Sequence, residues 1–125
     1  MATIEAAVDE IPGVEFTAAR AWDGTAAYVT ATLSATDSFV GDPAALIDYA
    51  LGQLASQTEI DRGGLVRFTF DAPGQSVETT QSYLTSLGIA SERYAGGSSL
   101  ELSNSDLDDR YGSWPAAVPE LPPTL

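Results

Sequence analysis

The chain has 125 residues, the usual size of one domain and too short for two. Apolar residues make up 44% of it and aromatic residues 9%, which supports a packed core and excludes an intrinsically disordered chain. Eighteen acidic residues against five arginines and no lysine give a net charge of −13, which disfavours binding to DNA, RNA or anionic lipid.

The amino-acid sequence shows no membrane-spanning segment and no signal peptide. No stretch approaches the roughly 18 consecutive apolar residues of a membrane-spanning helix. Residues 1–5 show neither the basic nor the apolar region of a signal peptide. We therefore expect a soluble domain that does not insert directly into a membrane.

The N-terminal third predicts a helix followed by a β-hairpin. Residues 4–11 carry apolar side chains at helical spacing, and Pro12-Gly13 ends that segment. Residues 14–22 predict a strand, with Asp23-Gly24 as a two-residue hairpin turn. The return strand alternates between an apolar face and a threonine-rich face that is exposed or only partly covered: Val29, Ala31 and Leu33 against Tyr28, Thr30, Thr32 and Ser34.

The middle of the chain predicts the main packing helix and a third strand. Asp42 is placed to cap this helix, and Pro43 occupies its first position, where a missing N–H costs nothing. Apolar residues continue at helical spacing to Leu54, and residues 65–70 alternate as a strand. Because a helix joins the second and third strands, we expect them to be parallel.

The C-terminal part predicts a helix capped by Ser76 and ended by Gly88, then a hairpin of residues 89–94 and 100–103. Residues 104–109 are predicted to form an acidic loop. The expected class is α+β, with a mixed, mostly antiparallel sheet of about five strands, helices on one face and the order α-β-β-α-β-α-β-β. We expect one compact domain over residues 1–112 and an extended, Trp/Pro-rich tail over residues 113–125.

The chain has no histidine, lysine or cysteine. Their absence excludes Ser–His–Asp and Cys–His catalysis, Schiff-base chemistry, iron–sulfur clusters and the usual zinc ligands. Carboxylate chemistry remains, but eighteen acids offer pairs by chance, and we interpret them as a solvated surface. The sequence therefore predicts no catalytic residue, no cofactor and no metal site, and a protein that is not an enzyme.

One acidic segment has the start of a calcium-loop pattern, with oxygen-bearing side chains at Asn104, Asp106 and Asp108. The sixth position of such a loop is glycine and is Asp109 here; the twelfth is glutamate and is Pro115 here. The EF-hand interpretation therefore fails. Weak binding of a divalent cation at Asp106, Asp108 and Asp109 is left open beside a simple exposed loop.

Aromatic and arginine residues are the candidate contact residues for a protein partner, because tryptophan, tyrosine and arginine dominate interface hot spots. The alternative for the two tryptophans is a buried anchor that ties the tail to the sheet. The candidates are Trp22, Arg93, Tyr94, Tyr111 and Trp114.

The run from Glu10 to Val14, the hairpin that follows it and the closing Trp114-Pro115 with spaced prolines resemble uncharacterised secreted proteins and lipoproteins of high-GC actinobacteria. The short helix–hairpin units also resemble BON-like domains, which are associated with cell envelopes. The resemblance spans residues 3–115 and contains no functional motif, so no residue role is carried over. It implies an extracellular or cell-envelope location; a cytoplasmic one stays open.

These observations lead to a main hypothesis and two alternatives. The first is a non-enzymatic interaction or accessory domain, the soluble part of a cell-envelope or secreted protein, with a protein partner and no nucleic acid. The alternatives are an acidic inhibitor, immunity or nucleic-acid-mimic protein that binds a basic partner, and a virion component. One negative face would favour the inhibitor; an even spread with an apolar patch near Trp22 or Trp114 would favour the first hypothesis. The deciding carboxylates are Asp37, Asp42, Asp48, Glu59, Asp61, Asp106, Asp108 and Asp109.

Overall fold

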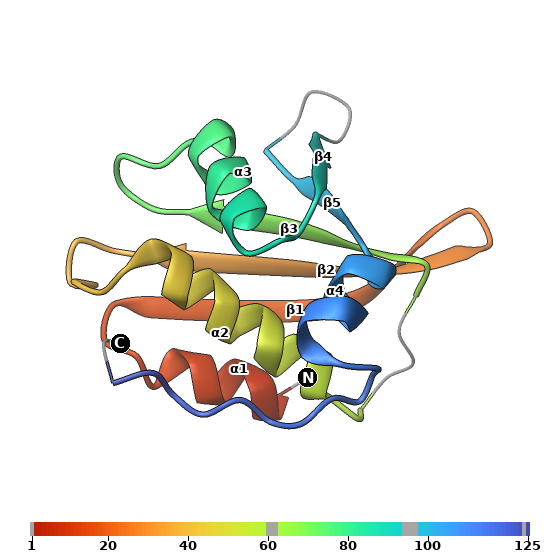
Figure 1. Ribbon diagram of the computed structural model, residues 1–125, viewed down its shortest axis with the longest axis horizontal. Helices are drawn as coiled ribbons and strands as arrows, with labels where there is room; N and C mark the ends of the chain where they lie inside the picture. The colour runs from red at the N-terminus through yellow and green to blue at the C-terminus, as the bar shows by residue number, and fades with distance from the viewer. Residues whose placement is uncertain (1, 60–62, 94–97, 124) are drawn as a thin grey trace.

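The computed structural model describes residues 2–59, 63–93, 98–123 and 125 (Figure 1). It confirms the α+β class and the predicted order of the first eight elements, and it adds a ninth. In chain order these are α1 (Ala2–Asp9), β1 (Val14–Asp23), β2 (Ala26–Ala35), α2 (Pro43–Ser56), β3 (Leu65–Asp71), α3 (Val77–Ser86), β4 (Ser91–Arg93), β5 (Leu100–Ser103) and α4 (Asn104–Tyr111).

The strands form one five-stranded mixed sheet in the order β1-β2-β3-β5-β4. β2 and β3 are parallel, as the intervening helix predicted, and the other neighbouring pairs are antiparallel. Each terminal hairpin therefore lies at its own edge of the sheet. In both hairpins the first strand is the outer one.

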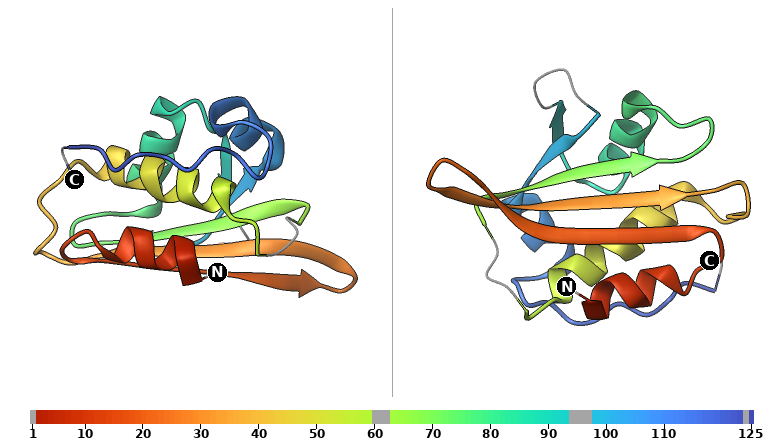
Figure 2. Two further views of the ribbon diagram at one scale, coloured as in Figure 1. Left: turned by 90° about the horizontal axis from the view of Figure 1, so that it is seen from below. Right: turned by 180° about the vertical axis from the view of Figure 1, so that it is seen from behind.

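Helices α2, α3 and α4 cover one face of the sheet, and α1 lies along the edge at β1 (Figure 2). The core lies between the sheet and α2. Most of α2 is buried because the sheet, α1, α4 and the C-terminal tail surround it. The largest fully buried side chains come from every layer: Phe16, Leu33, Leu46, Ile47, Leu51, Leu54, Phe68, Leu84, Ile89, Leu100, Leu102 and Leu107.

The helix boundaries have the predicted caps. Asp42 accepts a hydrogen bond from the Ala44 N–H at the start of α2, and Pro43 is the first helical residue. Ser76 and Thr79 form a reciprocal capping box at the start of α3. The Ile89 N–H donates to Leu84 O at 2.9 Å, which closes the C-terminus of α3 as expected.

The sheet face opposite the helices is rich in hydroxyl groups and is exposed on β1 and partly covered on β2, as the alternation predicted. Thr17, Thr32 and Thr69 are neighbours in register on β1, β2 and β3, and the Thr69 and Ser99 hydroxyls are 2.9 Å apart. Next to this row the Arg67 guanidinium stacks on the ring of Tyr28 at 4.1 Å.

The β1–β2 turn lies one residue later than predicted. Asp23 pairs with Ala26, so the two-residue turn is Gly24-Thr25 instead of Asp23-Gly24. Gly24 has φ +64°, a conformation that glycine adopts without strain, and this places it inside the turn. The tip of the hairpin projects past the rest of the sheet, because β2 pairs with β3 only from Val29 onward (Figure 1).

The predicted acidic loop of residues 104–109 is wrong: this segment is helix α4. Ser103 caps it by accepting a hydrogen bond from the Asp106 N–H, and Leu107 is buried against the core. Acidic residues near the start of a helix and Arg110 in its last turn suit the helix dipole. Capping, one buried leucine and favourable charge placement outweigh the low helix propensity of asparagine, serine and aspartate.

Within the described ranges, no helix is both long and apolar enough to span a bilayer. Gly96 and Gly97, which lie between the two strands of the predicted C-terminal hairpin, are outside the residues that the structure describes.

Candidate functional site

The tip of the β1–β2 hairpin carries an exposed tryptophan. Trp22 lies one residue before the end of β1, and 60% of its surface is exposed. The Arg20 guanidinium lies 5.2 Å from the centroid of its ring, a cation–π distance. The tip thus presents a large aromatic surface together with a positive charge.

Arg20 differs from the other described arginines because no carboxylate within the described ranges pairs with it. Arg67 lies 3.5 Å from Glu101, Arg93 lies 3.4 Å from Glu78, and Arg110 lies 2.7 Å from Asp48. The Arg20 Nε atom is buried and has no hydrogen-bond partner among the described residues. In a chain of net charge −13, an arginine left without an acidic partner is a feature to explain.

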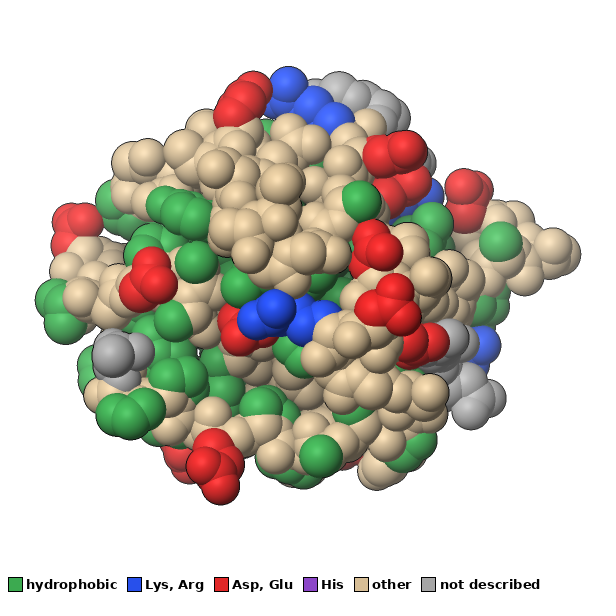
Figure 3. Space-filling view, in the orientation of Figure 1, with side chains coloured by type: hydrophobic (Ala, Val, Ile, Leu, Met, Phe, Trp, Pro, Cys, Tyr) green, Lys and Arg blue, Asp and Glu red, His purple; other side chains and the backbone are tan. Residues whose placement is uncertain are grey.

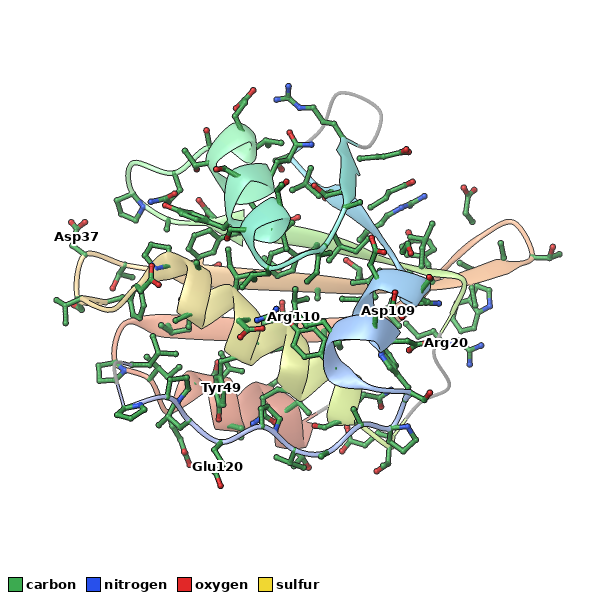
Figure 4. All side chains as sticks on the ribbon, in the orientation of Figure 1. Arg20, Asp37, Tyr49, Asp109, Arg110 and Glu120 are labelled. Carbon is green, nitrogen blue, oxygen red and sulfur yellow. The ribbon has the colours of Figure 1, made fainter. Side chains whose placement is uncertain are left out.

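A second group of polar residues joins three helices. The Asp48 carboxylate on α2 accepts hydrogen bonds from Arg110 Nε at 2.7 Å and from the Tyr111 hydroxyl at 2.8 Å. Arg110 Nη1 also donates to Leu87 O at the end of α3, at 2.9 Å. This cluster, Asp48, Arg110 and Tyr111, thus fixes α4 to α2 and α3; of its members, Arg110 is labelled in Figure 4.

The electrostatics of this cluster favour one fixed charge state. Burial by itself raises the pKa of Asp48. The hydrogen bonds from Arg110 and Tyr111 together with the charge of Arg110 lower it by a larger amount, so the net pKa lies below its usual value. Burial and the neighbouring Asp48 carboxylate raise the pKa of Tyr111 far above its usual value. Asp48 therefore stays ionised and Tyr111 stays protonated over a wide pH range, which suits a structural contact rather than proton transfer.

We predict that Asp48→Asn lowers the free energy of unfolding by about 1–2 kcal/mol at pH 7, a value reduced for solvent screening because the carboxylate is partly exposed. A carboxyl with a lowered folded-state pKa stabilises the fold above its unfolded-state pKa, and this contribution is lost as pH falls through the folded-state pKa. The difference between wild type and variant should therefore shrink below about pH 4.

Urea unfolding followed between pH 7 and pH 2 measures this difference. Asp37→Asn is the matched control, because Asp37 is exposed in the β2–α2 loop. A difference between wild type and Asp48→Asn that stays constant down to pH 2 would contradict the assignment.

Trp114 lies in the tail and packs, partly buried, against the core. The Trp114–Pro115 peptide bond is cis. Beyond it, the Ala116 N–H donates to Ala55 O at 2.8 Å. The tail then follows α2, where Pro119 approaches Gly52 so closely that a Cβ on Gly52 would lie 3.1 Å from Pro119 Cγ.

A shallow groove of about 320 Å³ lies between the tail, α2 and α4. Arg110, Tyr49 and Glu120, which are labelled in Figure 4, line this groove. Two of its three charged residues, Asp48 and Arg110, bind each other, so Glu120 is the remaining charged group that lines the groove.

The candidate contact residues are therefore divided between different parts of the molecule. Tyr111 and Trp114 are each partly buried against the core, the arrangement that the anchor alternative describes. Trp22 is exposed on the hairpin tip. Arg93 lies on the edge strand β4 and pairs with Glu78 of α3, and Tyr94 lies outside the described residues.

Sequence reasoning missed the partners of these residues. Asp48 is the only charged residue in α2, which is a local signal that it has a specific partner. Arg110 lies 62 residues away from Asp48 in sequence, and nothing local connects the two. Arg20 is two positions from Trp22 in a strand, a spacing that places both side chains on one face and predicts their contact.

The carboxylates that were to decide between the hypotheses are not all gathered at one place. Asp37 and Asp109 lie toward opposite ends of the molecule (Figure 4), and on the visible face acidic side chains occur at its top, left and bottom as well as in a group at its right (Figure 3). Asp48 is bound internally, and the Asp106 carboxylate accepts the Ala90 N–H at 3.0 Å. Asp61 lies outside the described residues.

No group of acidic side chains within the described ranges has the geometry to hold a metal ion. This includes Asp106, Asp108 and Asp109, for which weak cation binding stayed open. Their helical arrangement also removes the loop on which the calcium-loop comparison depended.

Comparisons with known proteins give no further guidance: no protein-family model, curated protein or solved structure matches this chain.

Proposed function

We propose that this chain is a non-enzymatic protein-binding domain that contacts its partner through the tip of the β1–β2 hairpin. The exposed Trp22 ring with Arg20 stacked over it carries this proposal. Tryptophan and arginine contribute more than other residues to the energy of protein interfaces, and a large aromatic ring in water gains free energy when a partner covers it.

Two further observations support a binding role over catalysis. The chain has none of the histidine, lysine and cysteine residues on which most enzyme mechanisms depend. The best-defined polar cluster holds Asp48 in an ion pair with Arg110, so its carboxylate is not poised to accept or donate a proton. The resemblance to secreted proteins and lipoproteins supports placing the domain in the cell envelope or outside the cell.

The separation of Asp37 and Asp109 toward opposite ends of the molecule supports the first hypothesis over the inhibitor alternative. The net charge of −13 produces a negative electrostatic field, which steers a positively charged partner toward the domain and speeds its association. The main hypothesis does not specify its partner; we propose a basic protein, as in the inhibitor alternative, with the hairpin tip as the point of contact.

We predict that Trp22→Ala weakens partner binding by about 2 kcal/mol or more, roughly thirtyfold, because it removes the exposed aromatic anchor. The tagged domain is used to retain proteins from an extract of the source organism, and the retained proteins are quantified for wild type and variant. The unfolding midpoint should change little, since Trp22 is mostly exposed.

The matched control is Val40→Ala. Val40 is 95% exposed in the β2–α2 loop, away from the hairpin tip, and its truncation should leave partner retention unchanged. Equal retention by wild type and Trp22→Ala would overturn the proposed contact surface.

A further inference from the structure

The outer edge of β1 is closed over its first half by carboxylates of α1. Asp9 Oδ1 accepts the Phe16 N–H at 2.7 Å, and Glu5 Oε2 accepts the Ala18 N–H at 2.9 Å. Asp23 and Ala26 close the two-residue turn as a hydrogen-bonded pair. The odd-numbered residues of β1 thus direct their backbone N–H and C=O groups toward β2. The even-numbered residues of β1 therefore direct their N–H and C=O groups to the outer edge.

The second half of this edge is open. Helix α1 has 8 residues and rises about 12 Å, whereas β1 has 10 residues and spans about 33 Å. The next outward-facing residues are Arg20 and Trp22, and within the described part of the chain nothing accepts a hydrogen bond from their N–H groups. Residues 20–23 thus present unpaired strand edge.

The opposite edge of the sheet is better protected. β4 has 3 residues, against 10 in β1. Gln81 Nε2 of α3 reaches Ser91 O at 3.5 Å, and the Arg93–Glu78 ion pair crosses from β4 to α3. Short strands and charged side chains are common means of preventing edge pairing.

We propose that an extended segment of the partner pairs with β1 at residues 20–23 and adds a sixth strand to the sheet. This inference rests on the proposed function and specifies how the hairpin tip binds. The N–H and C=O groups of Arg20 and Trp22 supply the backbone hydrogen bonds, and the Trp22 ring covers an apolar side chain of the added strand.

The net charge of −13 favours a basic segment over a second copy of the chain, although Arg20 lies on the edge itself and Asp23 lies 3.9 Å from Arg67. Two copies would bring together two net charges of −13 over an edge of only four residues. Asp23, whose side chain is 73% exposed, lies at one end of the open edge, and Glu5 and Asp9 of α1 lie beyond the other. An apolar, β-forming segment flanked by lysine or arginine fits this arrangement.

Amide hydrogen exchange of the wild-type domain tests the pairing directly. The probe is the blocked peptide Lys-Val-Thr-Val-Thr-Lys, and its matched control has glutamate in place of both lysines. We expect the basic peptide at millimolar concentration to slow exchange at the Arg20 and Trp22 amides by about tenfold, and the acidic peptide to leave it unchanged.

Unchanged exchange at both amides with the basic peptide would overturn the proposal. Equal protection by both peptides would overturn the basic partner. Protection that rises with protein concentration in the absence of peptide would assign the edge to a second copy instead. None of these outcomes depends on the partner-retention experiment with Trp22→Ala, so failure of strand pairing and failure of the binding role are distinguishable.

A pair of variants separates the backbone from the side chain. Arg20→Pro and Arg20→Ala both remove the guanidinium, but only proline also removes the outward N–H. An edge-strand proline whose nitrogen faces outward leaves the β1–β2 ladder intact. We expect Arg20→Pro to bind the basic peptide about tenfold more weakly than Arg20→Ala. Circular dichroism checks that both variants keep the native fold. If Arg20→Pro and Arg20→Ala are both folded and bind the basic peptide equally well, strand pairing is overturned.

Discussion

Replacing Gly63 by alanine should destabilise the domain by about 3 kcal/mol and lower Tm by roughly 10 °C. A Cβ at this position would lie 2.4 Å from Ala27 O and 2.5 Å from Tyr28 Cα, both in the backbone of β2. A flexible side chain could move aside, but a paired strand cannot. The segment before β3 would have to move away from the base of the hairpin.

That movement would also disturb two hydrogen bonds. The Gly64 N–H donates to Ala27 O at 2.9 Å, and Asn104 Nδ2 of α4 donates to Gly63 O at 2.6 Å. Each contributes about 1 kcal/mol when it is formed. The close approach of Gly63 thus links β2, β3 and α4 at one point.

Gly64→Ala is the matched control, because its Cβ would lie 3.9 Å from Ala27 O, an ordinary contact. Thermal and urea unfolding of both variants measure the difference, and the control should remain within about 1 kcal/mol of wild type. Similar losses in the two variants would show that the close approach is not the cause.

Trp114→Ala should lower the free energy of unfolding by about 2–3 kcal/mol. Full burial of a tryptophan is worth about 3–5 kcal/mol in such truncations, and Trp114 is only partly buried against the core. Its ring fixes the start of the tail, and the Ala116–Ala55 hydrogen bond and the Pro119–Gly52 contact follow it. Loss of the ring should therefore also loosen the tail from α2.

Urea unfolding measures the stability, and limited proteolysis after residue 114 measures tail release. Val118→Ala is the control: Val118 is 69% exposed in the same tail, so its truncation should cost less than about 0.5 kcal/mol. A Trp114→Ala variant as stable and as protease-resistant as Val118→Ala would contradict the anchoring role.

The elements that could be predicted have local signals for both their pattern and their ends. Helix α2 has an apolar stripe, an Asp42 cap and Pro43 at its first position. Strand β2 alternates strictly between buried and partly exposed residues. Such signals depend on neighbours within a few residues, and the parallel pairing of β2 and β3 follows from the helix between them.

Helix α4 could not be predicted in this way. Its eight residues include four with acidic or amide side chains and only one that is buried, so its pattern is typical of a loop. The contacts of Arg110 and Tyr111 with Asp48 span 62 and 63 residues of sequence. These long-range contacts help to hold a helix that local propensity does not favour.

The two tryptophans show the same limit at the candidate site. Both lie beside turn or proline residues, and the sequence predicts the same two alternatives for each, a buried anchor or an exposed contact residue. In the structure Trp114 packs against the core, whereas Trp22 is 60% exposed on a hairpin that extends beyond its neighbouring strand. The length by which one strand overhangs another depends on the whole sheet.

The sequence by itself determined which chemistry is absent, because a missing histidine, lysine or cysteine stays missing in any fold. It also determined the alternating faces and the helix caps, which are local properties. Only the tertiary structure decided which of the described arginines lacks a carboxylate partner and which strand edge stays open. Both depend on the lengths of two elements. The 8-residue helix α1 is too short to cover the 10-residue strand β1, so Arg20 and Trp22 lie beyond the carboxylates of α1.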